Sequence, residues 1–321
     1  MKKLLKVLLI ILASLGIFWG VVNIIPPHKV VEENTWRKTD DVLISAHRGG
    51  AELNPENTKM AFDYVIKDTS YCDIIEIDIW KTSDDVIVIT HDATLNRVAC
   101  IPEETPINVE ESTYAELSQY NLGKYFEDRN GDKPYENISL DEAKELGLTI
   151  MTLKDFFTEY QKVRDFRIFI EIKTKDDSCK ELVDDIEAMV ATEEFSWWND
   201  RYMYISFNSG VYKYTLEKYP NRYVAGMGFG MATQLAGAKL CLDPLFRTKY
   251  HSIQTSMITK VGPIGINCAT KRFVNAAHRR NQTVVYWTIN DVDDMQHLIN
   301  IGADIITTNA PDKLATLIGK N

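Results

Sequence analysis

Short β-rich runs alternate with amphipathic helical patterns from residue 42 onward, and this alternation constrains the fold more than any other feature. The strand-like runs are VLISAH, DIIEIDIW, VIVITH, RIFIEIK, YMYISF, YVAGMGF, TVVYWTI and ADIITT. Helical patterns separate several of them, so the connections have the βαβ form that builds a parallel sheet. About eight strands in about 280 residues predict an α/β protein, a TIM (β/α)8 barrel. A doubly wound open sheet is the alternative, but no Gly-x-Gly-x-x-Gly follows the first strand.

Two segments interrupt this regular pattern. Residues 94–150 are polar and rich in turn formers, so we expect an insertion over one end of the barrel, which itself occupies residues 42–321. Residues 1–27 contain an apolar run, Val7 to Ile25, which as a helix spans about 28 Å, close to the thickness of a bilayer core. This length predicts one uncleaved transmembrane anchor followed by a stalk, residues 28–41. A cleaved signal peptide is the alternative, although its apolar region would be shorter.

Charge and composition narrow the location and the partners. Lys2, Lys3 and Lys6 precede the apolar run, so the N-terminus is expected in the cytosol and the barrel outside the cell membrane. The formal net charge of −10 makes nucleic acid a poor partner, whereas local cations or a metal ion would still allow a phosphate ester to bind. The five cysteines show no Cys-x-x-Cys spacing, which argues against a zinc site and a disulfide scaffold.

Paired charged residues on two of the runs indicate a metal site. Glu76 and Asp78 are two residues apart in IIEIDIW, and Glu171 and Lys173 are two apart in IFIEIK, so each pair shares one face of its strand. Helices cover the outside of a barrel, so the intervening isoleucines should point outward and the charges inward. Carboxylates buried there are costly unless they are paired or bound to a cation. Three carboxylates without Cys or His predict Mg²⁺ or Ca²⁺, and a buried salt-bridge network is the alternative.

Two histidines end strand-like runs and are candidates for acid–base catalysis. His47 ends the first run and is followed by Arg48; His91 ends the third and is followed by Asp92. Active sites of barrels lie at the carboxyl ends of the strands, where a histidine pair could supply one base and one acid for hydrolysis. A lone histidine at a strand end is more often a core or capping residue, but here two of them accompany the carboxylates.

The stretch around the first histidine and one late strand add further candidates. Two glycines after Arg48 allow a sharp turn, and Asn57 or Thr58 can cap a helix that begins near Lys59. Trp287, at the tip of YWTIND, either packs in the core or forms a wall of the substrate site. Asn290 either contacts a ligand or begins a turn.

Four ordered motifs resemble the glycerophosphodiester phosphodiesterase family: HRGGAELNPENT, EIDIWKTSDDVIVITHDATLNR, FIEIK and VVYWTINDVDDMQHLINIGADIITTNAPDKL. The resemblance extends from about Ile44 to Leu314. It implies a TIM-barrel hydrolase that uses a divalent metal to cleave glycerophosphodiesters to glycerol 3-phosphate and an alcohol. It also implies roles for matching positions: His47 and His91 as acid–base pair, Glu76, Asp78 and Glu171 as metal ligands, Arg48 and Lys173 as phosphate ligands, and Trp287 as an aromatic near the substrate.

The chain departs from the family pattern in places that concern the substrate. The turn after the Glu-x-Asp strand reads Thr82-Ser83-Asp84-Asp85, without the usual glycine, and LNRVACIPEETP replaces a short turn after the second histidine. One alternative is therefore a lysophospholipase D or a sphingomyelinase-D-like enzyme that acts on lipids. A remote one is an inactive, membrane-anchored binding barrel, against which the intact set of His, Glu, Asp and Lys argues.

Overall fold

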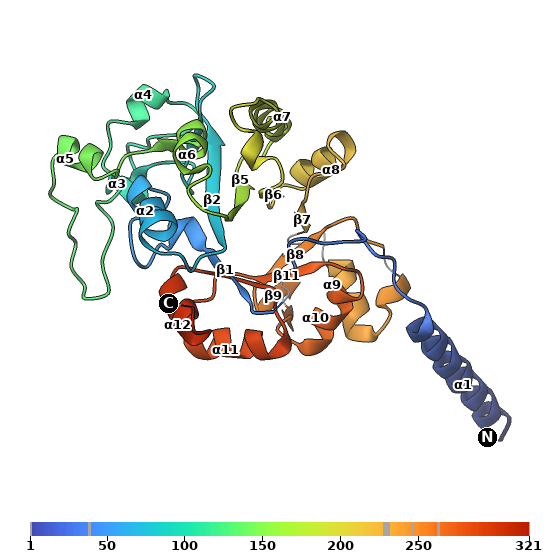
Figure 1. Cartoon of the computed structure of the whole chain (residues 1–321). Coiled ribbons are helices and arrows are strands. Elements are labelled where there is room, and N and C mark those ends of the chain that lie inside the picture. The colour runs from blue at the N-terminus through green and yellow to red at the C-terminus, as the bar shows by residue number, and fades with distance from the viewer. Residues whose placement is uncertain (1, 38–39, 227–231, 246, 262–263, 321) are drawn as a thin grey trace.

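Parallel strands form a closed barrel at the centre of the computed structural model, which describes residues 2–37, 40–226, 232–245, 247–261 and 264–320 (Figure 1). The barrel strands are β1 (Leu43–Ala46), β2 (Ile74–Lys81), β5 (Arg167–Ile172), β6 (Tyr202–Ile205), β7 (Ala225–Gly226), β8 (Ser252–Thr255), β11 (Thr283–Tyr286) and β12 (Ile305–Thr308). Parallel ladders join neighbouring strands in the order β6, β5, β2, β1, β12, β11, β8, β7. A parallel bridge between Tyr204 and Val224 joins β6 to the β7 segment and closes the ring.

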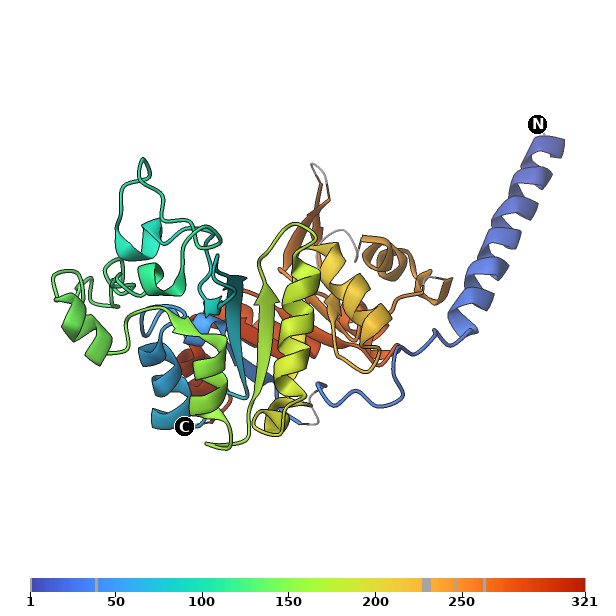
Figure 2. The ribbon, with the colours of Figure 1, turned by 90° about the horizontal axis from the view of Figure 1, so that it is seen from above.

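A helix follows every barrel strand before the next one begins. These helices are α2 (Lys59–Asp63), α6 (Leu153–Tyr160), α7 (Cys179–Val190), α8 (Ser209–Lys218), α9 (Ala232–Leu240), α10 (Lys271–His278), α11 (Val292–Ile301) and α12 (Pro311–Leu317). They lie around the outside of the strands (Figures 1 and 2). The predicted TIM barrel is confirmed.

The isoleucines of the charged strands face the helices, as expected. Ile75, Ile77 and Ile79 of β2 belong to the large apolar cluster that includes residues of the surrounding helices, such as Phe156 of α6. The alternate positions of β2 point into the barrel. The pattern of the sequence thus directs the carboxylates inward.

One strand assignment was wrong. The run VIVITH forms β3 (Ile87–Ile89), which pairs antiparallel with β2 and lies outside the ring. The short turn before it is too tight for the helical crossover that a parallel neighbour requires. The eighth barrel strand is instead β8, whose polar Ser252, Gln254 and Thr255 are buried. In YVAGMGF only Ala225–Gly226 form a strand, and residues 227–229 lie outside the described part of the chain.

Segments inserted after β2 and β8 extend beyond the ring. Residues 94–150 carry α3 (Asn96–Ala99), α4 (Tyr114–Leu117) and α5 (Leu140–Glu145), and the chain returns through β4 (Met151–Thr152), which pairs with β3. A separate small apolar cluster holds this region to Trp80 of β2. The second insertion is the hairpin of β9 (Ile258–Val261) and β10 (Ile264–Asn267).

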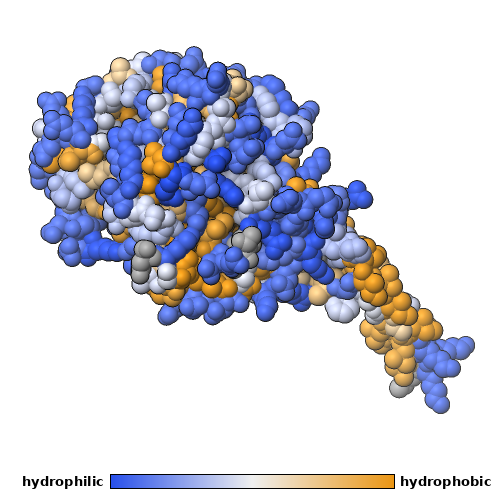
Figure 3. Space-filling view, viewed as in Figure 1, coloured by the Kyte–Doolittle hydropathy of each residue, from blue (hydrophilic) through white to orange (hydrophobic). Residues whose placement is uncertain are grey.

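The N-terminal apolar run forms α1 (Lys2–Ile24), which projects from the barrel with most of its side chains exposed (Figures 1 and 3). By length and composition it could cross a membrane, and a signal sequence would pass the same test. The segment after it packs on the amino end of the barrel. Asn34 donates to the carbonyl oxygens of His251 and Asn281 at 2.9 and 2.8 Å, and Trp36 is fully buried with its ring stacked on Phe169 at 5.4 Å.

Candidate active site

Three carboxylates from two adjacent strands lie together at the carboxyl end of the barrel. Glu76 and Asp78 come from β2 and Glu171 from β5, and Asp78 and Glu171 are direct partners in the register. One oxygen atom of each lies within 4.8 Å of the others. All three side chains are buried. The structure therefore brings together the three residues that the sequence predicts as metal ligands.

Two cations face this cluster from opposite sides. The Nε atom of Arg48 lies 3.3 Å from Oδ2 of Asp78, and the Arg48 backbone N–H donates to Oε2 of Glu76 at 2.9 Å. The Nζ atom of Lys173 lies 2.9 Å from Glu171 and 3.4 Å from Asp78. The two cations offset only part of the charge that the three carboxylates carry when all are ionised, and a role of Arg48 and Lys173 in binding phosphate stays a prediction.

The backbone after β1 is shaped so that Arg48 can reach the carboxylates. His47–Gly49 form one 3₁₀ turn, and Arg48, Gly49 and Gly50 all have positive φ, at 52°, 80° and 90°. At Gly49 an added Cβ would lie 2.9 Å from Cβ of Ala61 on α2, so only glycine fits. The sharp turn expected from the two glycines is present.

The electrostatics of the carboxylates favour a bound cation. Burial, together with Asp78 and Glu171, raises the pKa of Glu76 well above its usual value. Burial and Asp78 also raise the pKa of Glu171. Burial acts in the same direction on Asp78, but Lys173 and Arg48 outweigh it and lower that pKa. A cation among the three oxygens would stabilise the ionised forms.

Two buried oxygen atoms support the same reading. Oε1 of Glu76 and Oδ1 of Asp78 are buried, and neither has a hydrogen-bond partner within the described ranges. Asp78 Oδ1 has only the ion pair with Lys173 at 3.4 Å, whereas Glu76 Oε1 is a buried polar atom of the kind that is normally satisfied by a ligand. Carboxylate oxygens are the donors that Mg²⁺ and Ca²⁺ prefer, and the residues present therefore fit a hard divalent ion.

His47 is oriented by an asparagine beyond β12. Its Nδ1 lies 2.6 Å from Oδ1 of Asn309, and its Nε2 lies 3.9 Å from Oε2 of Glu76. The amide oxygen accepts the Nδ1 proton, so Nε2 is the unprotonated nitrogen that faces the carboxylates. Burial, reinforced by the nearby charge of Arg48, lowers the pKa of His47 to about 4. This imidazole is neutral at pH 7.

His91 follows β3, which runs antiparallel to the barrel strands. Because β3 runs antiparallel to β2, the hairpin returns toward the site, and the Thr90 N–H donates to the Asp78 carbonyl at 3.0 Å. The Nδ1 of His91 lies 2.7 Å from Oδ1 of Asp92. This hydrogen bond is the main cause that holds the pKa of Asp92 far below its ordinary value. Nε2 is therefore the ring nitrogen of His91 that Asp92 does not engage, and its action on a substrate stays a prediction.

A cavity of about 650 Å³ opens beside the carboxylates. His91, Glu171 and Lys173 line it, together with Phe207 after β6. Phe207 is 61% exposed, and its ring meets that of Trp287 edge-on at 5.7 Å. Phe207 thus places an exposed aromatic side chain at the cavity, next to the charged Glu171 and Lys173.

Asn290 faces the strand that carries the His47 partner. Its Oδ1 accepts from the backbone N–H of Asn309 at 2.9 Å and from the Thr308 hydroxyl at 3.2 Å. Through Asn309 it therefore supports the orientation of His47. A contact of Asn290 with substrate stays a prediction.

Sequence reasoning missed several polar residues that hold the site together. Glu56 is buried and accepts from Arg48 at 3.0 Å and from Arg97 at 2.6 Å. Asn57, one of two predicted helix caps, instead donates to Oδ2 of Asp78 at 2.8 Å, while Thr58 caps α2. Glu56 and Asn57 stand in the same short stretch as His47, and this was the only sequence signal for their role. The local sequence does not show whether Asn57 caps a helix or donates a hydrogen bond to Asp78.

Comparisons with known proteins agree with this geometry. The model of the glycerophosphoryl diester phosphodiesterase family matches residues 47–313. A glycerophosphodiester phosphodiesterase of Bacillus altitudinis is 24% identical over 84% of this chain and 95% of its own. A lysophospholipase D of Mus musculus is 29% identical, but the match covers only 48% of this chain and 44% of its own.

Solved structures show the same fold at low identity. A glycerophosphoryl diester phosphodiesterase domain from Mycobacterium tuberculosis superposes with a TM-score of 0.66 at 17% identity, covering 88% of this chain and 100% of its own. An Oleispira antarctica phosphodiesterase in complex with the product sn-glycerol-3-phosphate gives 0.62 at 19% identity, covering 87% and 97%. The chain belongs to the glycerophosphoryl diester phosphodiesterase family and is a phosphoric diester hydrolase.

Proposed function

We propose that this enzyme hydrolyses glycerophosphodiesters to glycerol 3-phosphate and an alcohol, with Mg²⁺ or Ca²⁺ held by Glu76, Asp78 and Glu171. The observation that carries the proposal is the cluster of three buried carboxylates, in which Oε1 of Glu76 has no hydrogen-bond partner among the described residues. The product named in the Oleispira antarctica complex is the one this reaction would release. When bound, the metal supplies positive charge against the phosphate oxygens.

The residues around the cluster have complementary parts in this reaction. Arg48 and Lys173 donate hydrogen bonds to the non-bridging phosphate oxygens, where negative charge grows as the nucleophile attacks. Nε2 of His47, neutral at pH 7, removes the proton from the attacking hydroxyl, which belongs to water or to the glycerol of the substrate. Attack by the glycerol hydroxyl expels the alcohol and forms a cyclic phosphate, which water then opens to glycerol 3-phosphate. Nε2 of His91 gives a proton to the oxygen of the departing alcohol. Trp287 forms part of the wall beside the glycerol. Asn290 supports Asn309, which orients His47.

The reaction is tested on the full chain in a mild detergent. Substrates are glycerophosphocholine, glycerophosphoethanolamine, glycerophosphoglycerol and a lysophospholipid, each with Mg²⁺, Ca²⁺ or EDTA. The measured product is glycerol 3-phosphate for the soluble diesters and lysophosphatidic acid for the lysophospholipid. Metal-dependent release from the soluble diesters is expected. Silence on every substrate with either metal would refute the proposal and favour a binding role for the barrel.

Substrates with different leaving groups distinguish the proposed roles of the two histidines. His47→Ala and His91→Ala should each lower kcat by roughly 10² to 10⁴, whereas His28→Ala, an exposed histidine beyond α1, should not. A diester whose leaving group is p-nitrophenol needs no proton, so it should restore activity to His91→Ala alone. Rescue of His47→Ala instead would reverse the two assignments.

A lipid substrate is the second candidate, because a large aromatic side chain is exposed at the cavity. The exposed Phe207 lies at the cavity, and the M. musculus relative is named a lysophospholipase D. Turnover of the lysophospholipid with no turnover of the soluble diesters would establish this candidate over the first.

We also propose that α1 anchors the enzyme in the cell membrane with its barrel on the extracytoplasmic side. The support is a 23-residue apolar helix with Lys2, Lys3 and Lys6 at its start. The chain should resist extraction from membranes by alkaline carbonate, and a protease added to intact cells should cleave the barrel. Release of the chain by carbonate would instead indicate a cleaved signal peptide.

A further inference from the structure

The last two turns of α1 contact residues 240 and 241, at the end of α9, and residues 240–245 form the segment considered below. The indole Nε1–H of Trp19 donates to the carbonyl oxygen of Leu240 at 3.1 Å, and the Asn23 side-chain amide donates to that of Cys241 at 3.0 Å. Trp19 lies about 8 Å inside the end of the helix, at 1.5 Å per residue. If α1 spans a bilayer, residues 240 and 241 therefore lie where the headgroups meet the acyl chains.

The side chains of this segment suit that depth. Leu240 is 61% exposed and Leu245 is 52% exposed, although most leucines of the barrel are buried. Contact with acyl chains would remove this apolar surface from water. Trp19 at the same level is the residue type that concentrates at membrane interfaces.

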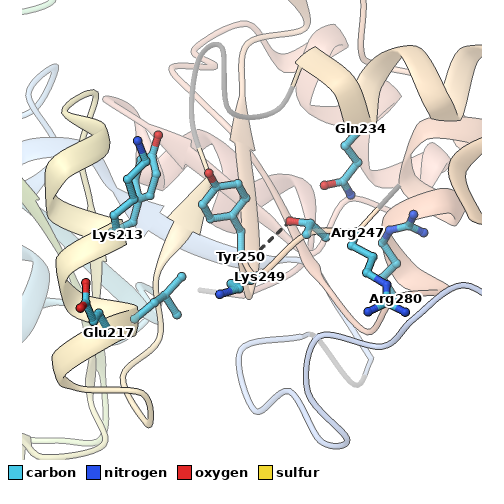
Figure 4. Close-up of a pocket in the computed structure, with 10 residues that line it drawn as sticks. Lys213, Glu217, Gln234, Arg247, Lys249, Tyr250 and Arg280 are labelled. Atoms are coloured by element: carbon cyan, nitrogen blue, oxygen red, sulfur yellow. Dashed lines mark hydrogen bonds between the residues drawn. The ribbon is translucent and has the colours of Figure 1, made fainter. Parts of the chain in front are cut away.

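A second cavity, of about 670 Å³, lies next to this segment (Figure 4). Its lining includes the cations Lys213, Arg247, Lys249 and Arg280 and a single carboxylate, Glu217. The chain as a whole has a net charge of −10, so this cavity reverses the overall sign. Local positive charge of this kind attracts an anionic group.

This second cavity lies at the opposite end of the barrel from the cavity beside Glu171, and other residues line it. Tyr250 precedes β8 and Arg280 precedes β11, so the second cavity lies toward the amino ends of the strands, whereas the carboxylates lie at the carboxyl ends. Figure 4 shows Lys213 on α8 on one side and Arg247 on the other, with Tyr250 between them. The rings of Tyr212 and Tyr250 pack edge-on at 5.0 Å and give it an aromatic wall.

Three of the cations are available to a ligand. Lys213, Arg247 and Lys249 are exposed, and no ion pair joins them to a carboxylate in the part of the chain that the structure describes. Arg247 follows Leu245 by two residues. The cavity therefore takes a lining residue, Arg247, from close in the chain to the exposed Leu245.

We propose that this cavity binds the headgroup of an anionic phospholipid from the bilayer that holds α1. The phosphate would lie among Lys213, Arg247 and Lys249, and the acyl chains would cover Leu240 and Leu245. The proposal rests on the membrane anchoring proposed above. A soluble phosphate ester would use the cations but would leave the leucines exposed, so the apolar neighbour favours the lipid.

Native mass spectrometry of the full chain in neutral detergent tests the site. The chain is offered equal amounts of phosphatidylglycerol and phosphatidylcholine with the same acyl chains, in EDTA. Both lipids carry the same phosphodiester, so the catalytic site cannot distinguish them by that group. Preferential binding of one lipid therefore reports the difference in headgroup charge. Wild type should prefer phosphatidylglycerol. Each cation near an anionic lipid raises the affinity for that lipid by about fivefold, so Arg247→Gln with Lys249→Gln should lower the preference for phosphatidylglycerol by about 25-fold.

A matched pair controls for overall charge. Lys133→Gln with Lys144→Gln, both exposed in the insertion, should keep the wild-type preference. The site is refuted if wild type binds the two lipids equally or if the Arg247 and Lys249 variant keeps its preference. It is also refuted as a lipid site if glycerol 1-phosphate, which lacks acyl chains, displaces phosphatidylglycerol at equal concentration.

Failure of this site is distinguishable from failure of the proposed function. The Arg247 and Lys249 variant should hydrolyse glycerophosphodiesters at the wild-type rate, because neither residue lines the catalytic cavity. Absence of hydrolysis in wild type would refute the proposed reaction and leave the lipid preference unaffected. Release of wild type from membranes by carbonate would overturn the anchor and this site together.

Discussion

Replacing Asn309 by alanine tests whether the side chain that orients His47 contributes to catalysis. The substitution removes the amide oxygen that lies 2.6 Å from His47 Nδ1 and leaves that nitrogen buried without a partner. The backbone contacts of Asn309, which donates to Asn290 and accepts from Glu52, remain in the variant. The loop should therefore keep its course, and the change should be confined to the imidazole.

The size of the effect follows from that single lost hydrogen bond. Leaving a buried polar group unsatisfied costs about 1 to 3 kcal/mol. If the whole of this cost falls on the transition state, kcat decreases by about 5- to 150-fold, since each 1.36 kcal/mol is about tenfold in rate. KM for a soluble diester should change little, because Asn309 holds the base and not the phosphate. Steady-state kinetics with glycerophosphoglycerol separates the two parameters.

A pH profile provides a readout that a merely structural role would not change. The pKa of His47 is about 4, so the imidazole stays neutral from pH 5 upward. Asn309→Asp places a carboxylate against Nδ1, which favours the protonated form and should shift the acid limb of kcat/KM to higher pH by about 1 unit or more. Asn300→Ala, an exposed asparagine on α11, is the control. If Asn309→Ala keeps kcat within about twofold while His47→Ala loses activity, the positioning argument is wrong.

Three further outcomes are expected. Glu171→Gln should raise the Mg²⁺ or Ca²⁺ concentration for half-maximal activity by at least about tenfold, measured by metal titration after EDTA; an unchanged value would exclude it as a ligand. Trp36→Ala should lower the free energy of unfolding by about 3 to 5 kcal/mol, measured in urea, because it removes a fully buried ring from Phe169; a loss below about 1 kcal/mol would contradict this. His251, which accepts from the Val224 N–H, has its pKa lowered by burial from 6.5 to about 4, so its contribution to stability is complete above pH 6.5 and is lost as the pH falls toward 4. The loss should be about 2 kcal/mol at pH 5, and His251→Phe should be spared it; equal acid sensitivity of the two proteins would refute the assignment.

The charged strands could be predicted from the sequence because their pattern is strong. Alternation of Ile with Glu76 and Asp78 leaves a strand only one orientation in a barrel covered by helices. The same reasoning failed for β8, where Ile253 is the single large apolar residue among buried polar ones. These polar side chains lie at interior positions supported by neighbouring strands, and no local pattern reveals such support.

The supporting residues of the site could not be predicted for a similar reason. Asn309 follows the last strand, 262 residues from His47 in the chain, and only closure of the barrel between β12 and β1 brings them together. His91 was predicted as a site residue on the assumption of a barrel strand, yet an antiparallel hairpin delivers it. The residue types indicated the chemistry. The contacts that orient each side chain form only when the barrel closes, so the sequence did not reveal them.

The packing of Trp36 and Asn34 on the amino end of the barrel has a mechanical consequence. A pull on α1 is carried into the barrel floor by a buried ring and two amide contacts, before it reaches β1. The loops that carry the candidate catalytic residues stand at the far end of the strands. If α1 is held in a membrane as proposed, tension on it therefore acts on the amino end of the barrel, away from those loops.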